Sequence, residues 1–294
     1  MNEPAIEEKY GNQETGYTIK PGVFADIPDT EYHASPGISK HGLDLIARSP
    51  AHYKHFSIEQ TPALAFGSAF HAYVLEPLKF RQKFSVAIYD DFRTKVAREW
   101  KQAMIEQGVT IISQQDFRTI EAMATVLRAN ENAARLLNLD HGRAENSAYW
   151  VDANRNIWKH ETPTFRLCRC RPDFINDKLR VVVDLKTTLC AGYSAFVRDT
   201  VKYRYHVQDA FYVDGLRQCG ERVDAFVFVC IEKAPPYGLG LYELSKPDRE
   251  LGRQLYQRDL LRYHDCMTDK KWPGYDEEIR VVDLPPWASK TDIF

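Results

Sequence analysis

Residues 165–188, FRLCRCRPDFINDKLRVVVDLKTT, decide the fold of this chain. Apolar residues between arginines from Phe165 to Cys170 predict a first strand, which runs into Arg171-Pro172-Asp173. The turn-forming residues Asn176-Asp177-Lys178 separate it from a β-branched second strand, Leu179 to Leu185. An uninterrupted apolar run of this length is typical of a strand that is buried on both faces of a sheet.

Charged side chains gather where the second strand ends. Asp184 and Lys186 are two residues apart, so they point to the same side of the sheet, and Asp173 can reach that side from the neighbouring strand. Converging carboxylates repel each other unless a cation lies between them, and oxygen ligands suit Mg²⁺ or Mn²⁺. A lysine beside such a metal can orient or help deprotonate water and neutralise phosphate charge. The pattern predicts phosphodiester hydrolysis. For an isolated Asp-x-Lys triplet, a buried salt bridge between Asp184 and Lys186 is the commoner explanation.

The longer pattern is more specific, because Pro172 precedes Asp173 and ten residues separate Asp173 from Asp184. It resembles the signature of the PD-(D/E)xK nuclease superfamily. Other segments resemble RecE-type exonucleases, which are exodeoxyribonuclease VIII-like, and they follow the same order over most of the chain. These segments are Gly37-Ile38-Ser39-Lys40, Ser49-Pro50-Ala51-His52-Tyr53, Phe66-Gly67-Ser68-Ala69-Phe70-His71, Cys170 to Asp173, Asp184 to Thr188, and Gln208 with Tyr212.

The resemblance implies a metal site and names its residues. A histidine on the helix before the core completes the metal site in RecE-like nucleases, although alone such a histidine is more often a hydrogen-bonded core residue. Mg²⁺, with Mn²⁺ as a substitute, would be held by His71, Asp173, Asp184 and the Leu185 carbonyl. Lys186 would position or activate the attacking water. Glu145 would bind or position the metal shell; otherwise it is an exposed strand residue.

The resemblance also implies contacts with DNA. In exonucleolytic relatives a Gln-x3-Tyr pair lies beside the strand that is cut, and here Gln208 and Tyr212 share one face of a helix predicted from Ser194 to Leu216. A glutamine can bond a phosphate or base edge, and a tyrosine can stack on a base. The simpler alternative is an ordinary amphipathic helix. Nearby basic residues extend the predicted interface, although solvated surfaces also carry such charges. They are Arg171, Lys202 and Arg204.

The implied activity is an Mg²⁺-dependent exodeoxyribonuclease that digests double-stranded DNA from its ends, 5′ to 3′, and leaves a single-stranded tail for recombination. RecE-like enzymes work as homo-oligomeric rings and pass that strand to a single-strand annealing protein. Two alternatives are an endonuclease of the same superfamily and a catalytically silent DNA-binding scaffold. The intact acidic, histidine and lysine residues disfavour the scaffold.

The order of predicted elements indicates an α/β (α+β) fold, with a mixed central sheet flanked by helices and an N-terminal helical part. We expect a flexible tail at 1–20 and a single nuclease domain at 21–270, made of a helical part (21–140) and a catalytic core (141–270). A tail at 271–294 is available to a neighbouring subunit. The predicted elements include helices at 39–48, 63–76 and 248–267, a helical stretch at 93–138 interrupted near 108–112, a hairpin turn at 152–156, and strands at 225–232 and 239–244.

The composition fits a globular protein of 294 residues with a net charge of −2, which argues against indiscriminate coating of DNA but not against a local basic groove. No apolar run approaches the ~20 residues of a membrane span, and the first residues lack a signal-peptide core, so we expect a cytoplasmic protein. Some relatives hold an iron–sulfur cluster with four cysteines, including a close group of cysteines near the C-terminus. The six cysteines of this chain include no such group, so we expect no cluster.

Overall fold

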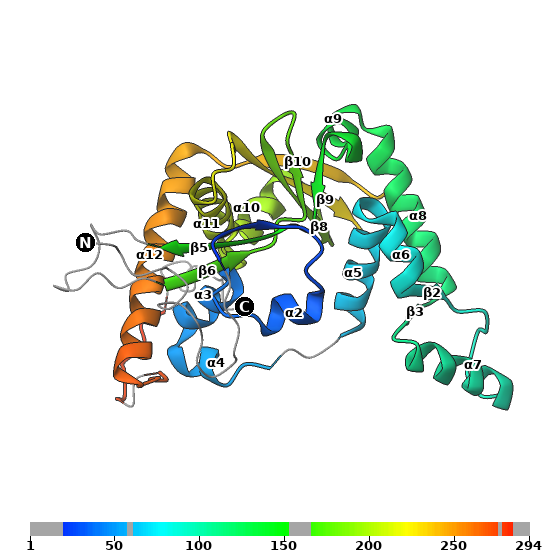
Figure 1. Ribbon diagram of the computed structural model, residues 1–294, viewed down its shortest axis with the longest axis horizontal. Helices are drawn as coiled ribbons and strands as arrows, with labels where there is room; N and C mark the ends of the chain where they lie inside the picture. The colour runs from blue at the N-terminus through cyan, green and yellow to red at the C-terminus, as the bar shows by residue number, and fades with distance from the viewer. Residues whose placement is uncertain (1–19, 58–60, 153–165, 276–277, 285–294) are drawn as a thin grey trace, which may run out of the picture.

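A computed structural model describes residues 20–57, 61–152, 166–275 and 278–284 of the chain (Figure 1). A five-stranded mixed sheet lies at its centre, in the order β10-β9-β8-β7-β4. The strands β8 and β9 run parallel and the other neighbours run antiparallel. The predicted fold class is confirmed. The bounds are β4 Gly142–Ala144, β7 Phe174–Asn176, β8 Val181–Thr188, β9 Ala225–Glu232 and β10 Leu239–Glu243.

A second sheet corrects the hairpin that we predicted from residues 165–188. Strand β6 (Arg166–Cys170) does not pair with β8; it pairs with β5 (Ser147–Asp152), which pairs with β1 (Gly22–Phe24). The partner of β8 is instead the short β7, which begins directly after Asp173. The chain therefore leaves one sheet and enters the other at Arg171-Pro172-Asp173, which places the Pro-Asp pair at the junction of the two sheets.

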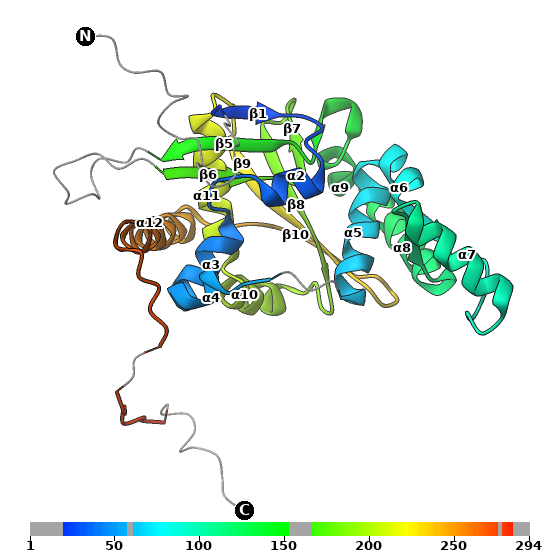
Figure 2. The same ribbon diagram turned by 60° about the horizontal axis from the view of Figure 1, so that its bottom comes forward.

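Helices cover both faces of the central sheet (Figures 1 and 2). On one face, Phe211 and Leu260 share a core with Val182 and Phe228 of the sheet. On the other face, Phe70 and Ile120 pack with Val183. The helices are α2 Asp29–Ala34, α3 Lys40–Arg48, α4 Pro50–Lys54, α5 Pro62–Leu75, α6 Pro77–Lys83, α7 Lys95–Glu106, α8 Gln114–Ala129, α9 Glu131–Leu136, α10 Tyr193–Lys202, α11 Tyr205–Gln218 and α12 Lys246–Asp269, with η1 at Leu139–His141 and a small sheet of β2 (Phe84–Val86) and β3 (Thr110–Ile112).

Local chemistry sets most helix ends where the sequence predicts them. The Ser39 side chain accepts a hydrogen bond from the backbone N–H of Gly42, and α3 begins at the next residue. Pro62 occupies the first turn of α5, where its missing N–H costs nothing. The helix predicted over 194–216 is wrong in one respect, because it breaks into α10 and α11 at Arg204, which has a left-handed φ of 56°.

The start of the C-terminal tail is attached to α3 and α4. The Trp272 ring stacks on Tyr53, and the Ala51 N–H donates to the Pro273 carbonyl. Arg48 donates to the Tyr275 hydroxyl. The predicted N-terminal tail and the hairpin turn after Asp152 fall on residues 1–19 and 153–156, outside the described ranges.

Candidate active site

Three side chains of types that can bind a metal ion converge at the junction of the two sheets. His71 comes from α5, Glu145 from the bend between β4 and β5, and Asp173 from the residue before β7. One donor atom from each lies within 4.8 Å of the others. Glu145 has a left-handed φ of 51°, and its N–H donates to the Asp173 carbonyl at 3.1 Å. The backbone itself therefore holds the two carboxylates side by side.

Asp173 is the centre of this group. Its Oδ2 accepts a hydrogen bond from the Leu185 N–H at 2.7 Å and lies 3.6 Å from Nδ1 of His71. The α5 neighbours Ala69 and Phe70 are fully buried, whereas the His71 side chain is 25% exposed. The helix thus presents this histidine to the acids at the edge of the core rather than burying it.

Asp184 and Lys186 form a second group with Gln208. The Lys186 Nζ lies 2.6 Å from Oδ2 of Asp184 and donates to Oε1 of Gln208 at 3.3 Å. The Gln208 side-chain amide donates to Oδ1 of Asp184, which is almost completely buried. The salt bridge that is the commoner explanation of an Asp-x-Lys triplet therefore forms. It lies next to the group of His71, Glu145 and Asp173.

The electrostatics of the site are those of crowded acids. Burial raises the pKa of Glu145 well above its ordinary value, and the negative charges of Asp173 and Glu76 act in the same direction. Burial also raises the pKa of Asp173, although His71 opposes that shift. Burial alone would lower the pKa of Lys186, but Asp184 and Asp173 outweigh it and raise the pKa above its ordinary value. Lys186 is therefore an ammonium ion at neutral pH.

The donor set fits a hard divalent cation. The group offers one imidazole nitrogen from His71 and carboxylate oxygens from Glu145 and Asp173, whose pKa values are both raised. A cation between the two carboxylates would neutralise their repulsion. The group that the structure assembles is His71, Glu145 and Asp173, with Asp184 directed to Lys186 and Gln208. The Leu185 carbonyl stays a predicted ligand.

Comparison with known proteins identifies the family. Residues 44–285 match the model of a PDDEXK-like domain of unknown function, DUF3799. The chain belongs to this family. Its PDDEXK-like fold is shared with a crystal structure of a candidate exonuclease from Eubacterium rectale (TM-score 0.55, 15% identity, 91% of this chain and 99% of that chain). The structure of SSO0001 has a TM-score of 0.30 at 14% identity, over 69% of this chain and 87% of that chain. No curated protein matches the sequence.

The family match supports the nuclease assignment that the Pro-Asp and Asp-Leu-Lys segments predicted, and a nuclease of this type would act on DNA. PDDEXK nucleases typically use divalent metals, which agrees with the His-Glu-Asp group. Within the described residues, no helix combines the length and apolarity needed to cross a membrane.

The residues predicted to contact DNA in this PDDEXK-like domain have different surroundings. Arg171 is 8% exposed and donates to Ser147, Asp29 and the Ile27 carbonyl, so its guanidinium serves to fasten the α2 segment to β6. Arg204 is held by Asp44 and Asp259. Lys202 is exposed at the end of α10, beside the Tyr203 ring. Tyr212 is half-buried near the site.

Tyr205 and Glu76 also lie at the site, although the sequence analysis did not predict them as site residues. The Lys186 Nζ lies 5.2 Å from the centre of the Tyr205 ring, and burial raises the pKa of Tyr205 to about 12, so the phenol stays neutral. Glu76 caps the end of α5 and is paired with Lys79 at 2.5 Å. The position of Tyr205 one turn before Gln208 was the feature of the sequence that could have predicted its place in the site.

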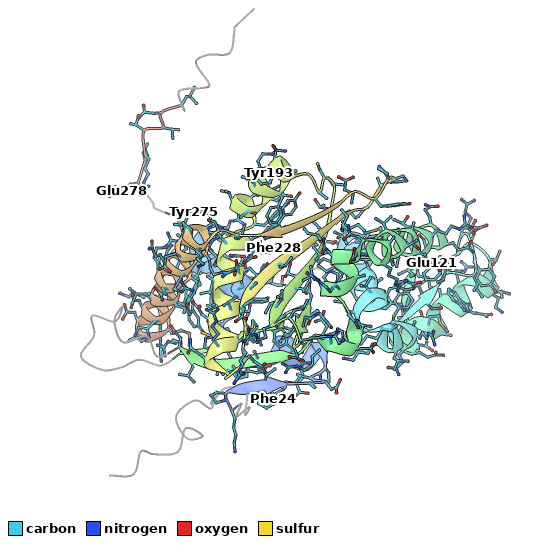
Figure 3. All side chains as sticks on the ribbon, turned by 90° about the horizontal axis from the view of Figure 1, so that it is seen from above. Phe24, Glu121, Tyr193, Phe228, Tyr275 and Glu278 are labelled. Atoms are coloured by element: carbon cyan, nitrogen blue, oxygen red, sulfur yellow. The ribbon has the colours of Figure 1, made fainter. Side chains whose placement is uncertain are left out.

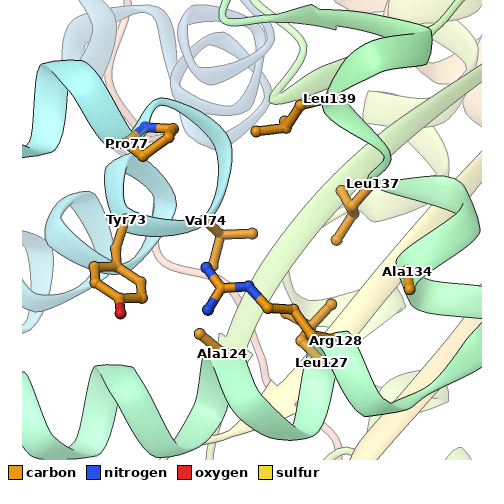
Figure 4. Close-up of a pocket in the computed structure, with 9 residues that line it drawn as sticks. All are labelled: Tyr73, Val74, Pro77, Ala124, Leu127, Arg128, Ala134, Leu137 and Leu139. Atoms are coloured by element: carbon orange, nitrogen blue, oxygen red, sulfur yellow. The ribbon is translucent and has the colours of Figure 1, made fainter.

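The apolar pocket of about 180 Å³ in Figure 4 lies between α5, α8 and α9, and none of the acidic residues of the site lines it.

Proposed function

We propose that this PDDEXK-like domain is an Mg²⁺-dependent exodeoxyribonuclease acting on the ends of double-stranded DNA. The observation that carries the proposal is the meeting of the His71, Glu145 and Asp173 donor atoms beside the Asp184–Lys186–Gln208 group. These are the parts that phosphodiester hydrolysis needs: ligands for a divalent cation and a fixed positive charge next to it.

Each residue has a physical role in the proposal. His71, Glu145 and Asp173, with Asp184 and the Leu185 carbonyl, would hold the metal, which as a Lewis acid lowers the pKa of water and stabilises phosphate charge. Lys186 is protonated, so it orients the attacking water by donating a hydrogen bond and stabilises negative charge. Asp184 and Gln208 position the ammonium group.

The finer features of the proposal are supported by the resemblance to RecE-type exonucleases. They are 5′ to 3′ polarity, a single-stranded product for recombination, a single-strand annealing protein as partner, a homo-oligomeric ring and a cytoplasmic location. Gln208 and Tyr212 would lie beside the strand that is cut, and Lys202 would contact a phosphate. Arg171 and Arg204 are engaged within the protein, so we assign them positioning roles rather than DNA contacts.

The test compares an end-labelled linear duplex with a closed circle of the same sequence, in Mg²⁺ and in EDTA. We expect nucleotide release from the linear DNA only, loss of activity in EDTA, and recovery with Mg²⁺ or Mn²⁺. Lys186→Ala should remove activity, whereas Lys178→Ala, an exposed lysine in the turn before the same strand, should not. Cleavage of the circle at an equal rate would instead establish an endonuclease, and DNA binding without hydrolysis a silent scaffold.

A further inference from the structure

The outer face of α10 carries an apolar stripe that the rest of the described chain does not cover. Tyr193, Val197 and Val201 recur every four residues of α10, so they line one side of the helix, and Leu189 adds a further apolar side chain in the loop between β8 and α10. They are 45 to 88% exposed. An ordinary surface helix turns such a stripe toward the core, whereas α10 buries only Phe196 and Thr200. Four apolar side chains in a row on the surface indicate an interaction surface.

The C-terminal segment has the same character. Ile279, Val281, Val282 and Leu284 are each 77 to 102% exposed. The segment follows Tyr275 and the stacked Trp272, which attach its start to α3 and α4. From there residues 278–284 run away from the body of the protein (red in Figure 2). Within one chain, this segment and the α10 stripe are thus two largely exposed apolar surfaces, although the Tyr193 ring also lies 6.4 Å from the Tyr242 ring.

The two surfaces match in length and charge. From Tyr193 to Val201 the stripe extends about 12 Å at 1.5 Å per residue. The extended segment from Ile279 to Leu284 extends about 16 Å at ~3.3 Å per residue, enough to cover it. The exposed Arg198 borders the stripe, and the segment carries Glu278 and Asp283 against the single Arg280. These acids can pair with the basic border when the apolar side chains meet.

We propose that the α10 stripe is the docking surface for the C-terminal segment Glu278–Leu284 of a second copy of this chain. Tyr193 and Tyr275 lie on the same side of the molecule (Figure 3), and the stripe and the segment are different surfaces, so each copy can dock its segment on the stripe of the next copy, the head-to-tail contact from which rings are built. Each such contact covers one stripe and one segment. The inference deepens the homo-oligomer of the proposed function. Its test needs neither DNA nor catalysis, so a failure of the nuclease proposal is distinguishable from a failure here.

The native Cys190, which is exposed beside Leu189, allows a direct test in the full chain. In Leu284→Cys protein, an added oxidant should join the two thiols into a covalent dimer on a non-reducing gel. The Cys190→Ser, Leu284→Cys double variant should not form it. A disulfide within one chain would show that the segment covers its own α10 and would overturn the proposal.

Sedimentation equilibrium measures the same contact without a cross-link. Val197→Asp with Val201→Asp, and separately Val281→Asp with Val282→Asp, should weaken self-association at least tenfold. Val96→Asp is the matched control, because Val96 is also exposed (60%) but lies on α7. Unchanged association of either double variant would refute the proposal. If the α10 variant lost DNA affinity and kept its association, the stripe would be a DNA surface and the proposal would also fail.

Discussion

Replacing Glu145 by glutamine tests the electrostatics of the candidate metal site. The Glu145 and Asp173 donor atoms lie within 4.8 Å of each other. Two full charges at that separation repel by about 3.5 kcal/mol at an effective dielectric constant of ~20. Solvent reaches both side chains, so we expect about half of this, roughly 1–2 kcal/mol, to appear as lost stability when both are ionised. For a chain of this length that corresponds to a change in Tm of about 2–3 °C.

The sign follows from the raised pKa of Glu145. Below the ordinary glutamate pKa, the folded and unfolded chains both hold the proton and no penalty exists. As the pH rises from there through the folded-state pKa, the unfolded chain has released the proton first, so the metal-free protein loses stability. Glu145→Gln cannot ionise. Its free energy of unfolding should therefore fall less over this range, with Asp173 responsible for the fall that remains.

The assay is thermal unfolding in EDTA across this pH range, with Glu121→Gln as control because Glu121 is exposed on α8 (Figure 3). The control should follow the wild type. Calorimetric titration with Mn²⁺ adds the second arm: the glutamine variant should bind at least tenfold more weakly and release fewer protons. A variant with the pH profile and the Mn²⁺ affinity of the wild type would refute the metal-site assignment of Glu145.

Three further predictions concern packing and positioning. Gly252→Ala should lower Tm by several degrees, because the added Cβ would lie 1.9 Å from a backbone oxygen of α11, whereas Gly67→Ala meets nothing within 4 Å and should stabilise α5 by about 0.5–1 kcal/mol. Arg249→Met should cost about 3–5 kcal/mol in chemical denaturation because it leaves the buried Asp209 unpaired, and adding Asp209→Asn should recover most of the loss. Gln208→Leu should lower kcat about 10–100-fold, because Lys186 loses the hydrogen bond that positions its ammonium group. The Mn²⁺ affinity should stay unchanged, because His71, Glu145 and Asp173 are all retained. A fall in Mn²⁺ affinity would contradict the positioning role of Gln208.

Sequence reasoning succeeded where one local rule decided the structure. The bounds of β9 agree residue for residue with the predicted strand at 225–232, because its apolar run is long and uninterrupted. It failed at β7, whose three residues are too few to show a period, so the pairing with β8 was assigned to the longer strand before it. The break at Arg204 escaped it as well. A left-handed arginine is stabilised by partners distant in sequence, here Asp44 and Asp259.

The position of His71 shows most clearly what the sequence alone left open. A histidine on an apolar helix is consistent with either a core residue or a ligand, and only tertiary packing separates the two. The packing supports the proposed ligand role, because α5 buries Phe70 in the cluster that contains Val183 of β8 and places Nδ1 of His71 3.6 Å from Asp173. The helical part and the catalytic core thus share one hydrophobic cluster, so the metal group cannot form until α5 is packed against the sheet. Phe70→Ala makes a cavity in that cluster, so it should lower both the free energy of unfolding and the Mn²⁺ affinity. If the folded variant bound Mn²⁺ as tightly as the wild type, the metal site would be built from the sheet alone.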